Sequence, residues 1–267
     1  MNESALSSIS LFDSNSHPTI SGRNLRGEQG YSFETTGELL HEAGIRKACA
    51  VGLPGVGDYS PAAFAKEAAK DDLWIPIAAL DCNYAELTKE RCLKLKEMGF
   101  KGLKVHPRLL RQSLDTPALT HLLITSEAAD LPLFLCSYPD FQNSGGASLG
   151  LVHVVSEATL SAPNSKLVLV HAGCLDFLYY IELCRHRPNI LLDLSFTLCK
   201  YQGSSVDQDI QYAFKSFDQR ICIGSDYPEF SPWLMRERFE QFTRGVQTEK
   251  CENIAWKNLA SFLGVSF

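Results

Sequence analysis

The amino-acid sequence predicts an α/β protein folded as a closed (β/α)8 barrel, a single domain over residues 1–267. Eight short apolar segments rich in β-branched residues recur along the chain, and a segment with helical spacing follows each of them. Polar residues gather at the carboxyl-terminal ends of these strands, which meet at one mouth in a closed barrel. An open doubly wound sheet has the same alternation, but no Gly-x-Gly-x-x-Gly motif follows the first strand, which disfavours a dinucleotide-binding sheet.

The expected strands and helices alternate along the chain. The strands are predicted at residues 11–17, 46–53, 73–80, 100–107, 131–138, 166–173, 189–196 and 220–228. The helices are predicted at residues 35–44, 61–71, 84–99, 117–130, 149–160, 176–186, 206–217, 233–245 and 249–263. Pro61 and Pro117 stand where a first helical turn begins, and Gly99 follows the last turn of an amphipathic segment. The loop from Pro18 to Ser32 has three glycines and few apolar residues, so we expect a mobile cover over the mouth.

The composition excludes several classes of protein. The chain has 25 Lys and Arg residues against 31 Asp and Glu residues, and its formal charge of −6 disfavours a nucleic-acid partner. No apolar run approaches the roughly 18 residues that span a bilayer, so no membrane contact is expected. The first ten residues lack the features of a secretory signal, and nine widely spaced cysteines are typical of a reducing compartment. Together these observations predict a cytoplasmic protein.

Four residues at strand ends are the leading candidates for chemistry. Asn15 and His17 lie on the same face of the first strand, because strand side chains alternate. Asp226 ends the eighth strand, which closure of the barrel places beside the first, so His17 and Asp226 can share a cation or a proton. His171 ends the sixth strand after four apolar residues, where its ring can act as a base or a ligand.

A second group of polar residues belongs to the fourth and seventh strands. Lys104, His106 and Arg108 alternate toward the mouth, and a substrate that bears a carboxylate would find paired donors there. The alternative for Lys104 is a structural ion pair with Asp193 inside the barrel. Asp193 and Ser195 are expected to hydrogen-bond the neighbouring strand ends rather than the substrate.

Six motifs in the expected order resemble a known family. The motifs are FDSNSH, GFKGLKVHP, LPLFLCS, KLVLVHAG, NILLDLS and RICIGSDYP, followed by ENIAWKNLASFLGV. They resemble the amidohydrolase superfamily, in its amidohydrolase-related branch of metal-dependent hydrolases and decarboxylases, over nearly the whole chain. The resemblance implies a (β/α)8 (TIM) barrel. It also implies a divalent metal held by a His-x-His on strand one, a His on strand five and an Asp on strand eight, with the strand-six His as the catalytic acid/base.

This chain matches that ligand pattern in part. His17, His171 and Asp226 match, whereas Asn15 and Cys136 stand where the pattern has histidines. The metal site implied is therefore Asn15, His17, Cys136 and Asp226, with zinc as the expected metal, because zinc accepts imidazole, thiolate and carboxylate. An amide oxygen is a poor ligand for zinc, so a site without metal is the alternative.

The predicted function is hydrolysis of an amide, lactone or ester bond in a small molecule. His171 and Asp226 would activate water, with Lys104, His106 or Arg108 binding the substrate and its oxyanion. Nonoxidative decarboxylation on the same fold is an alternative, and a catalytically inactive barrel that binds a metabolite or a protein is another. The polar mouth favours an enzyme. Self-association into a homo-oligomer stays open.

Overall fold

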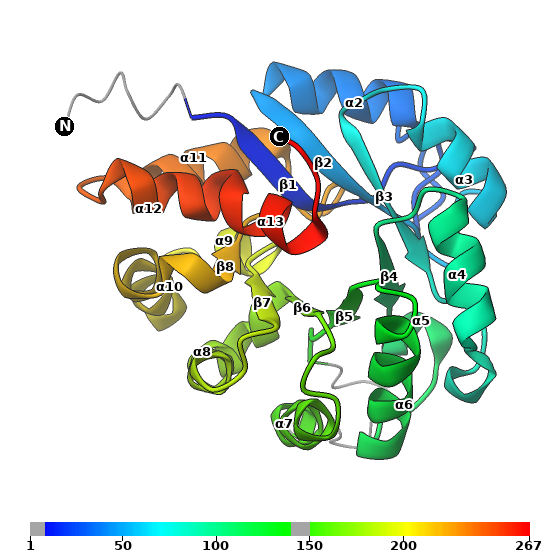
Figure 1. The fold of residues 1–267 in the computed structure, drawn as a ribbon. Coiled ribbons are helices and arrows are strands. Elements are labelled where there is room, and N and C mark those ends of the chain that lie inside the picture. Colours follow the sequence, from blue (N-terminus) through cyan, green and yellow to red (C-terminus); the bar gives the residue numbers. More distant parts are fainter. Residues whose placement is uncertain (1–8, 140–149) are drawn as a thin grey trace.

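A computed structural model describes residues 9–139 and 150–267 and shows a (β/α)8 barrel (Figure 1). Eight parallel strands neighbour one another in sequence order, as the alternation of the sequence predicts. They are β1 (Leu11–Ser16), β2 (Ile45–Val51), β3 (Trp74–Ala79), β4 (Gly102–Val105), β5 (Leu133–Cys136), β6 (Leu167–Val170), β7 (Ile190–Asp193) and β8 (Ile221–Cys222). The strands are buried along almost their whole length, which explains their nearly continuous apolar sequences.

Backbone hydrogen bonds between the segments that begin in β1 and β8 close the barrel. The Ser14 N–H donates to the Ile223 carbonyl at 2.9 Å, the Asp226 N–H to the Asn15 carbonyl at 2.8 Å, and the His17 N–H to the Tyr227 carbonyl at 2.9 Å. The predicted adjacency of the first and eighth strands is therefore confirmed. Two short segments more than 200 positions apart in the sequence lie side by side.

Helices connect the strands on the outside of the barrel. They are α2 (Phe33–Glu42), α3 (Pro61–Ala68), α4 (Lys89–Glu97), α5 (Pro107–Leu110), α6 (Thr116–Glu127), α7 (Leu151–Ser161), α8 (Phe177–Arg185), α9 (Thr197–Lys200), α10 (Ser205–Ser216), α11 (Pro232–Thr243), α12 (Thr248–Glu252) and α13 (Asn258–Leu263). Their starts follow capping chemistry. Ser60 accepts a hydrogen bond from the Ala63 N–H at 3.3 Å, and Asp115 accepts one from the Ala118 N–H at 2.9 Å. Proline in the first turn of α3 and α6 confirms the predicted starts.

The predicted helices and the structure differ in four places. The helix predicted at 84–99 is a 3₁₀ turn, η1 (Tyr84–Glu86), followed by α4, because extended backbone at Leu87 and Thr88 separates them. The helix predicted at 249–263 contains a π-helical stretch, η5 (Asn253–Lys257). The short helices α5 and α9 were not predicted, since four residues are too few to show a period. Leu149, part of a predicted helix, and residues 1–8, part of the segment considered as a secretory signal, lie outside the described residues.

The strands are shorter than predicted at their carboxyl-terminal ends. The chain leaves β6 through four consecutive residues of positive φ, His171 to Cys174, within the 3₁₀ segment η3 (His171–Asp176). The 3₁₀ turn η4 (Asp218–Arg220) precedes β8, and β8 itself ends at Cys222, before the predicted end of the strand. Residues predicted as strand ends therefore form tight loops, and these loops carry the candidate catalytic side chains.

Apolar side chains fill the barrel interior and its amino-terminal end. Phe267 stacks on Trp256 with ring centroids 4.7 Å apart and on Phe12, inside the barrel, at 6.0 Å. Leu259 and Leu263 of α13 belong to the same buried cluster, and α13 lies across the centre of Figure 1. Because this end is closed by packing, the polar mouth at the opposite end is where a ligand can enter.

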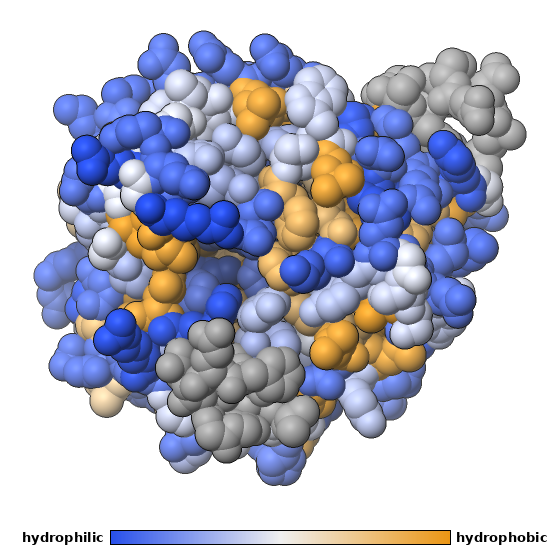
Figure 2. All heavy atoms as spheres, turned by 180° about the vertical axis from the view of Figure 1, so that it is seen from behind, coloured by the Kyte–Doolittle hydropathy of each residue, from blue (hydrophilic) through white to orange (hydrophobic). Residues whose placement is uncertain are grey.

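The outer surface is mixed in character. Seen from behind the view of Figure 1, it is mostly hydrophilic, with apolar residues in separate patches (Figure 2). Within residues 9–139 and 150–267, no helix combines the length and the apolar character needed to cross a membrane.

Candidate active site

A cavity of about 400 Å³ opens at the carboxyl-terminal ends of the strands. It collects most of the side chains that the sequence identifies as candidates. Those that line it are His17, Lys104, His106, Arg108, His171 and Asp226. Asn15 and Cys136 do not line the cavity; they are buried in the layer beneath its floor.

Two side chains, from the first strand and the loop after it, lie against Asp226. The Asn15 side-chain Nδ2 donates to Asp226 Oδ1 at 2.5 Å, and His17 Nε2 lies 3.3 Å from the same oxygen. The predicted approach of His17 to Asp226 is therefore confirmed. Burial raises the pKa of Asp226, but His171 and His17, with Lys104, outweigh it and hold the pKa below its ordinary value. Asp226 is an ionised carboxylate at neutral pH.

The orientation of Asn15 follows from its neighbours. Its Nδ2 also lies 3.2 Å from the hydroxyl of Ser195, so the amino group has an acceptor for each of its two hydrogens. The opposite orientation would bring Oδ1 against the Asp226 carboxylate, which is electrostatically unfavourable. Asn15 Oδ1 is buried and has no hydrogen-bond partner within the described residues.

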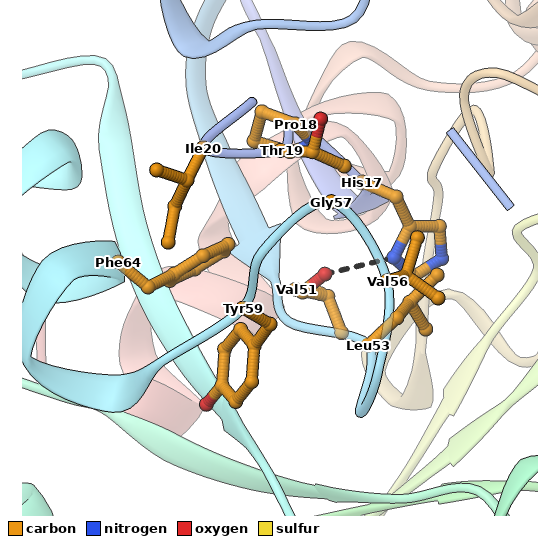
Figure 3. Close-up of a pocket in the computed structure, with 10 residues that line it drawn as sticks. All are labelled: His17, Pro18, Thr19, Ile20, Val51, Leu53, Val56, Gly57, Tyr59 and Phe64. Carbon is orange, nitrogen blue, oxygen red and sulfur yellow. Dashed lines mark hydrogen bonds between the residues drawn. The ribbon is translucent and has the colours of Figure 1, made fainter. Parts of the chain in front are cut away.

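A backbone carbonyl fixes the ring of His17. Its Nδ1 donates to the carbonyl of Val51, at the end of β2, at 2.8 Å (Figure 3). This bond sets the proton on Nδ1 and turns Nε2 toward Asp226. Figure 3 also shows a second cavity beside His17, of about 10 Å³, about the space that one water molecule requires.

His171 is held from below by Ser195, in the loop after β7. Its Nδ1 donates to the Ser195 carbonyl at 3.0 Å and lies 3.2 Å from the Ser195 hydroxyl. Nε2 is therefore the nitrogen left for chemistry at the cavity. Burial lowers the pKa of His171, but Asp226 and Cys136 outweigh it and raise the pKa above its ordinary value.

Strained backbone positions the site. His171, Phe196 and Asp226 have φ of 70°, 66° and 56°, in the left-handed region that residues with a Cβ avoid. Each such residue costs about 1–3 kcal/mol, and such residues cluster at active sites. Three of them on the ends of neighbouring strands indicate that the fold holds these side chains at a cost in stability.

Cys136 lies among three side chains that carry or can carry positive charge. Burial opposes ionisation of its thiol, but His106 and His171 outweigh burial and hold the pKa of Cys136 well below its ordinary value. Burial lowers the pKa of His106 and of Lys104, and Cys136 opposes the shift in both. Cys136 is therefore placed to pair with His106 and His171 beneath the cavity floor.

Lys104 and Arg108 present donors to the cavity. The suggested ion pair of Lys104 with Asp193 does not form within the described part of the chain. The Arg108 guanidinium stacks over the ring of Tyr138, 4.6 Å from its centroid, and its buried Nε has no partner among the residues described. A planar cation at the wall of a cavity matches a carboxylate in shape and charge.

The predicted metal site can be tested against these contacts. A ligand must direct a lone pair at the metal, but Asn15 directs its amino group at Asp226, the carboxylate it would share with a metal. Cys136 lies below the cavity and pairs with histidines. Among the described residues, no three His, Cys, Asp or Glu side chains are grouped so as to hold a metal ion. The residues present therefore do not fit the metal that the superfamily resemblance implies.

The loop from Pro18 to Ser32 lies over the cavity, as expected for a cover. Its residues Thr19, Asn24, Leu25, Arg26, Glu28 and Tyr31 line the cavity. Arg26 forms an exposed ion pair with Glu229, in the loop after β8, at 3.0 Å. Gly57 has φ 57° and lets the loop pack closely, since a Cβ there would lie 2.3 Å from the Cβ of Thr19. The tip of the loop is held by its own hydrogen bonds, since Asn24 Oδ1 accepts from the Arg26 and Glu28 N–H groups, both at 2.9 Å.

Two wall residues were not identified from the sequence. Tyr138 and Phe196 line the cavity, and their rings contact each other edge to face at 5.0 Å and also contact His171. Tyr138 lies two residues after β5 and Phe196 three residues after β7, and that position is the signal that could have identified them.

Comparison with known proteins identifies the type of barrel. The amidohydrolase family model matches residues 23–265. No curated protein matches the sequence at a significant level. An uncharacterised TIM-barrel protein, Bb4693 from Bordetella bronchiseptica, superposes with a TM-score of 0.78 at 18% identity, covering 96% of this chain and 99% of that one.

Two further solved structures have named activities. One, from Acinetobacter baumannii, is named as a probable 2-pyrone-4,6-dicarboxylic acid hydrolase and contains citric acid; its TM-score is 0.70 at 14% identity, over 96% of this chain and 100% of that chain. The other is 5-carboxyvanillate decarboxylase from Sphingomonas paucimobilis, with a TM-score of 0.69 at 14% identity, over 97% and 100% of the two chains. At these identities the similarity establishes the fold.

Proposed function

The chain belongs to the amidohydrolase family, and from this premise we propose that it is a hydrolase of small carboxylate-bearing esters or lactones. The family and its structural neighbours are enzymes, both hydrolases and decarboxylases. One observation carries the choice of hydrolysis. Asp226 and His171 face the cavity together, with cationic donors on the wall beside them. This is the set that water attack on an acyl carbon requires.

The proposed reaction uses side chains of this chain alone. Asp226 Oδ2 has no hydrogen-bond partner within the described residues, so it can orient a water molecule against His171 Nε2. The water oxygen attacks the acyl carbon as its proton passes to Nε2 of His171 in its neutral form, which is populated above the raised pKa of that residue. Lys104 and Arg108 donate to the oxyanion that forms. When the bond to the leaving oxygen breaks, His171 returns the proton to that atom.

We propose that this reaction proceeds without a metal ion. The family typically uses a divalent metal, zinc being the expected one here, but the amino group of Asn15 donates to Asp226 where a metal ligand would be needed. Elemental analysis of protein purified without chelator tests this proposal, with Asp226→Ala as the comparison. We expect less than stoichiometric metal in both proteins. A stoichiometric metal that is lost in Asp226→Ala would contradict the proposal.

Product analysis tests the proposed activity. Lactones with carboxylate groups, such as 2-pyrone-4,6-dicarboxylate, are the first substrates to assay, with neutral lactones of similar size for comparison. We expect one additional acid group for each lactone opened, and no carbon dioxide. Release of carbon dioxide from 5-carboxyvanillate would favour the decarboxylase alternative. Binding without turnover in the whole panel would favour an inactive binding barrel.

Arg108 should determine the preference for a carboxylate. Replacing it in Arg108→Gln removes a charge-assisted hydrogen bond, so KM for a carboxylate-bearing lactone should rise about tenfold or more. KM for a neutral lactone should change by less than about twofold. Steady-state kinetics on both substrates measure the two ratios. Arg111, an exposed arginine at the end of α5, supplies the matched control variant Arg111→Gln. An equal rise of KM for both lactones would remove Arg108 from carboxylate recognition.

The loop from Pro18 to Ser32 should be protected by ligand. Trypsin can cleave after Arg23 and Arg26 in this loop, and a ligand in the cavity would contact its inner residues. With citrate as the probe, we expect slower cleavage at these two sites and an unchanged rate after the exposed Arg111. Mass spectrometry of timed digests measures both rates. Equal digestion of the loop with and without saturating citrate would show that it is not a cover for this cavity.

A further inference from the structure

One buried carboxylate, Asp193 at the end of β7, lies beneath the active site and touches nothing in the cavity. Its Oδ2 accepts a hydrogen bond from the Ser195 hydroxyl at 2.5 Å. Its Oδ1 accepts from the Ser14 hydroxyl at 2.5 Å and from the Ser195 N–H at 2.8 Å. Asp193 is fully buried, and all three bonds point to it as an acceptor.

The bond to Ser195 has a directional consequence. A hydroxyl has one hydrogen, and that of Ser195 is committed to Asp193. The oxygen of Ser195 can therefore only accept from its two other neighbours, Asn15 Nδ2 at 3.2 Å and His171 Nδ1 at 3.2 Å. Both of these nitrogens must present a hydrogen to it.

The two hydrogen bonds that Ser195 accepts, from His171 and from Asn15, each affect a group at the cavity. The hydrogen on His171 Nδ1, which the Ser195 carbonyl also accepts, makes Nε2 the basic nitrogen of the neutral imidazole. The amino group of Asn15, turned to Ser195, is the one that also donates to Asp226. One carboxylate outside the cavity thus sets the hydrogen-bond direction of both sides of the site.

We propose that Asp193 is a positioning residue that acts through the Ser195 hydroxyl on His171 and Asn15. The inference rests on the proposed function, because it concerns the base of that reaction. Asp193 does not touch the substrate. It keeps the imidazole in the tautomer with the proton on Nδ1 and keeps the Asn15 amino group facing Asp226.

Asp193→Asn is the informative substitution. When the asparagine oxygen takes the place of Oδ1, it keeps the hydrogen bonds from the Ser14 hydroxyl and the Ser195 N–H. The asparagine amino group then takes the place of Oδ2 and faces the Ser195 hydroxyl. Ser195 must then turn its own hydrogen toward Asn15 or His171, where a donor already points. Ser14→Ala is the matched control, because it removes another buried hydrogen bond of Asp193 and leaves Ser195 unchanged.

The kinetic test compares kcat and KM in these variants. In Asp193→Asn we expect kcat to fall at least about tenfold, since an imidazole in the wrong tautomer is a poor base, while KM changes less than about twofold. Ser14→Ala should keep kcat within about threefold. In a Ser195→Ala background, Asp193→Asn should cost much less than it does alone, because the hydroxyl that transmits its effect is gone. Equal losses of kcat in Asp193→Asn and Ser14→Ala, or an undiminished loss in the Ser195→Ala background, would overturn the proposal.

A spectroscopic test needs no substrate. In protein labelled with ¹⁵N-histidine and held at a pH above the raised pKa of His171, the ring nitrogens of His171, assigned by their loss in His171→Asn, should report a proton on Nδ1 in the parent and in Ser14→Ala. In Asp193→Asn the two shifts should move toward each other as the tautomers mix. If Asp193→Asn does not fold, Ser195→Ala against Ser195→Thr, which keeps the hydroxyl, gives the same comparison. Unchanged ¹⁵N shifts of His171 in a folded Asp193→Asn protein would overturn the proposal for Asp193, even if the parent hydrolyses lactones. If these signals move but the parent has no hydrolase activity, the result counts against the proposed function alone.

Discussion

His171→Asn should lower kcat by roughly 10²-fold or more while the protein stays folded. The asparagine amide can still donate to the Ser195 carbonyl, as His171 Nδ1 does at 3.0 Å, so the loop after β6 keeps its anchor. What is lost is Nε2, the atom that takes the proton from water and returns it to the leaving group. Steady-state kinetics on the carboxylate-bearing lactone measure the fall in kcat, and thermal unfolding checks the fold.

A second histidine provides the control for this prediction. His153 lies exposed on α7, away from the cavity lining, so His153→Asn should leave kcat within about twofold. A His171→Asn protein with the kcat of the parent would remove His171 from the mechanism. Asp226 would then be the remaining group able to accept the proton from water.

Asn15→His together with Cys136→His should create a zinc site that binds at least about tenfold more tightly than the parent, a gain of at least roughly 1.4 kcal/mol. The first change removes the amino group that donates to Asp226 and adds an imidazole beside His17. The second replaces the buried Cys136 side chain with another imidazole. Imidazole is a much better zinc ligand than an amide, and the strand ends hold it in place. Titration against a competing chelator measures both affinities.

The outcomes of this titration separate two models of the site. Adding Asp226→Ala to the double variant should abolish the gain in zinc affinity, because the new histidines need the Asp226 carboxylate as a further zinc ligand. Equal, tight binding of zinc by the parent would mean that its site is already complete, with Cys136 as a ligand. Absence of binding in a folded double variant would mean that the three strand ends do not converge as the contacts of Asn15 and Asp226 indicate.

Most of the fold could be predicted because its signals are local. The strands of a barrel covered by helices are buried on both faces, and so they appear in the sequence as short apolar runs at regular intervals. Capping residues and first-turn prolines placed the starts of α3 and α6. The strand ends were predicted too long, because the positive φ of His171 and Asp226 depends on contacts between strands that no single segment contains.

The sequence predicts which residues lie at the candidate site, but it does not predict how their side chains are oriented. Position in the barrel identified His17, His171 and Asp226, which the structure brings to one cavity. The sequence does not specify which way the amide of Asn15 points, because that depends on an acceptor 180 positions away, Ser195. The stacking of Arg108 on Tyr138 is likewise a contact between two loops, and residue type alone does not predict it.

The segments that begin in β1 and β8 form the seam of the barrel, and their distance in the sequence has a consequence for the order in which the site assembles during synthesis. A ribosome makes Asn15 and His17 early, but Asp226, their shared partner, emerges 211 residues after Asn15. A nascent chain that has completed seven strands thus holds the imidazole of His171 without the carboxylate that completes the site. The contact of His17 with Asp226 therefore forms only late in synthesis. Moving the chain ends to an exposed loop between two other strands would reduce the separation of Asp226 and Asn15 from 211 positions to about 56, that is (267 − 226) + 15, and such a permuted chain would bring this pair together sooner.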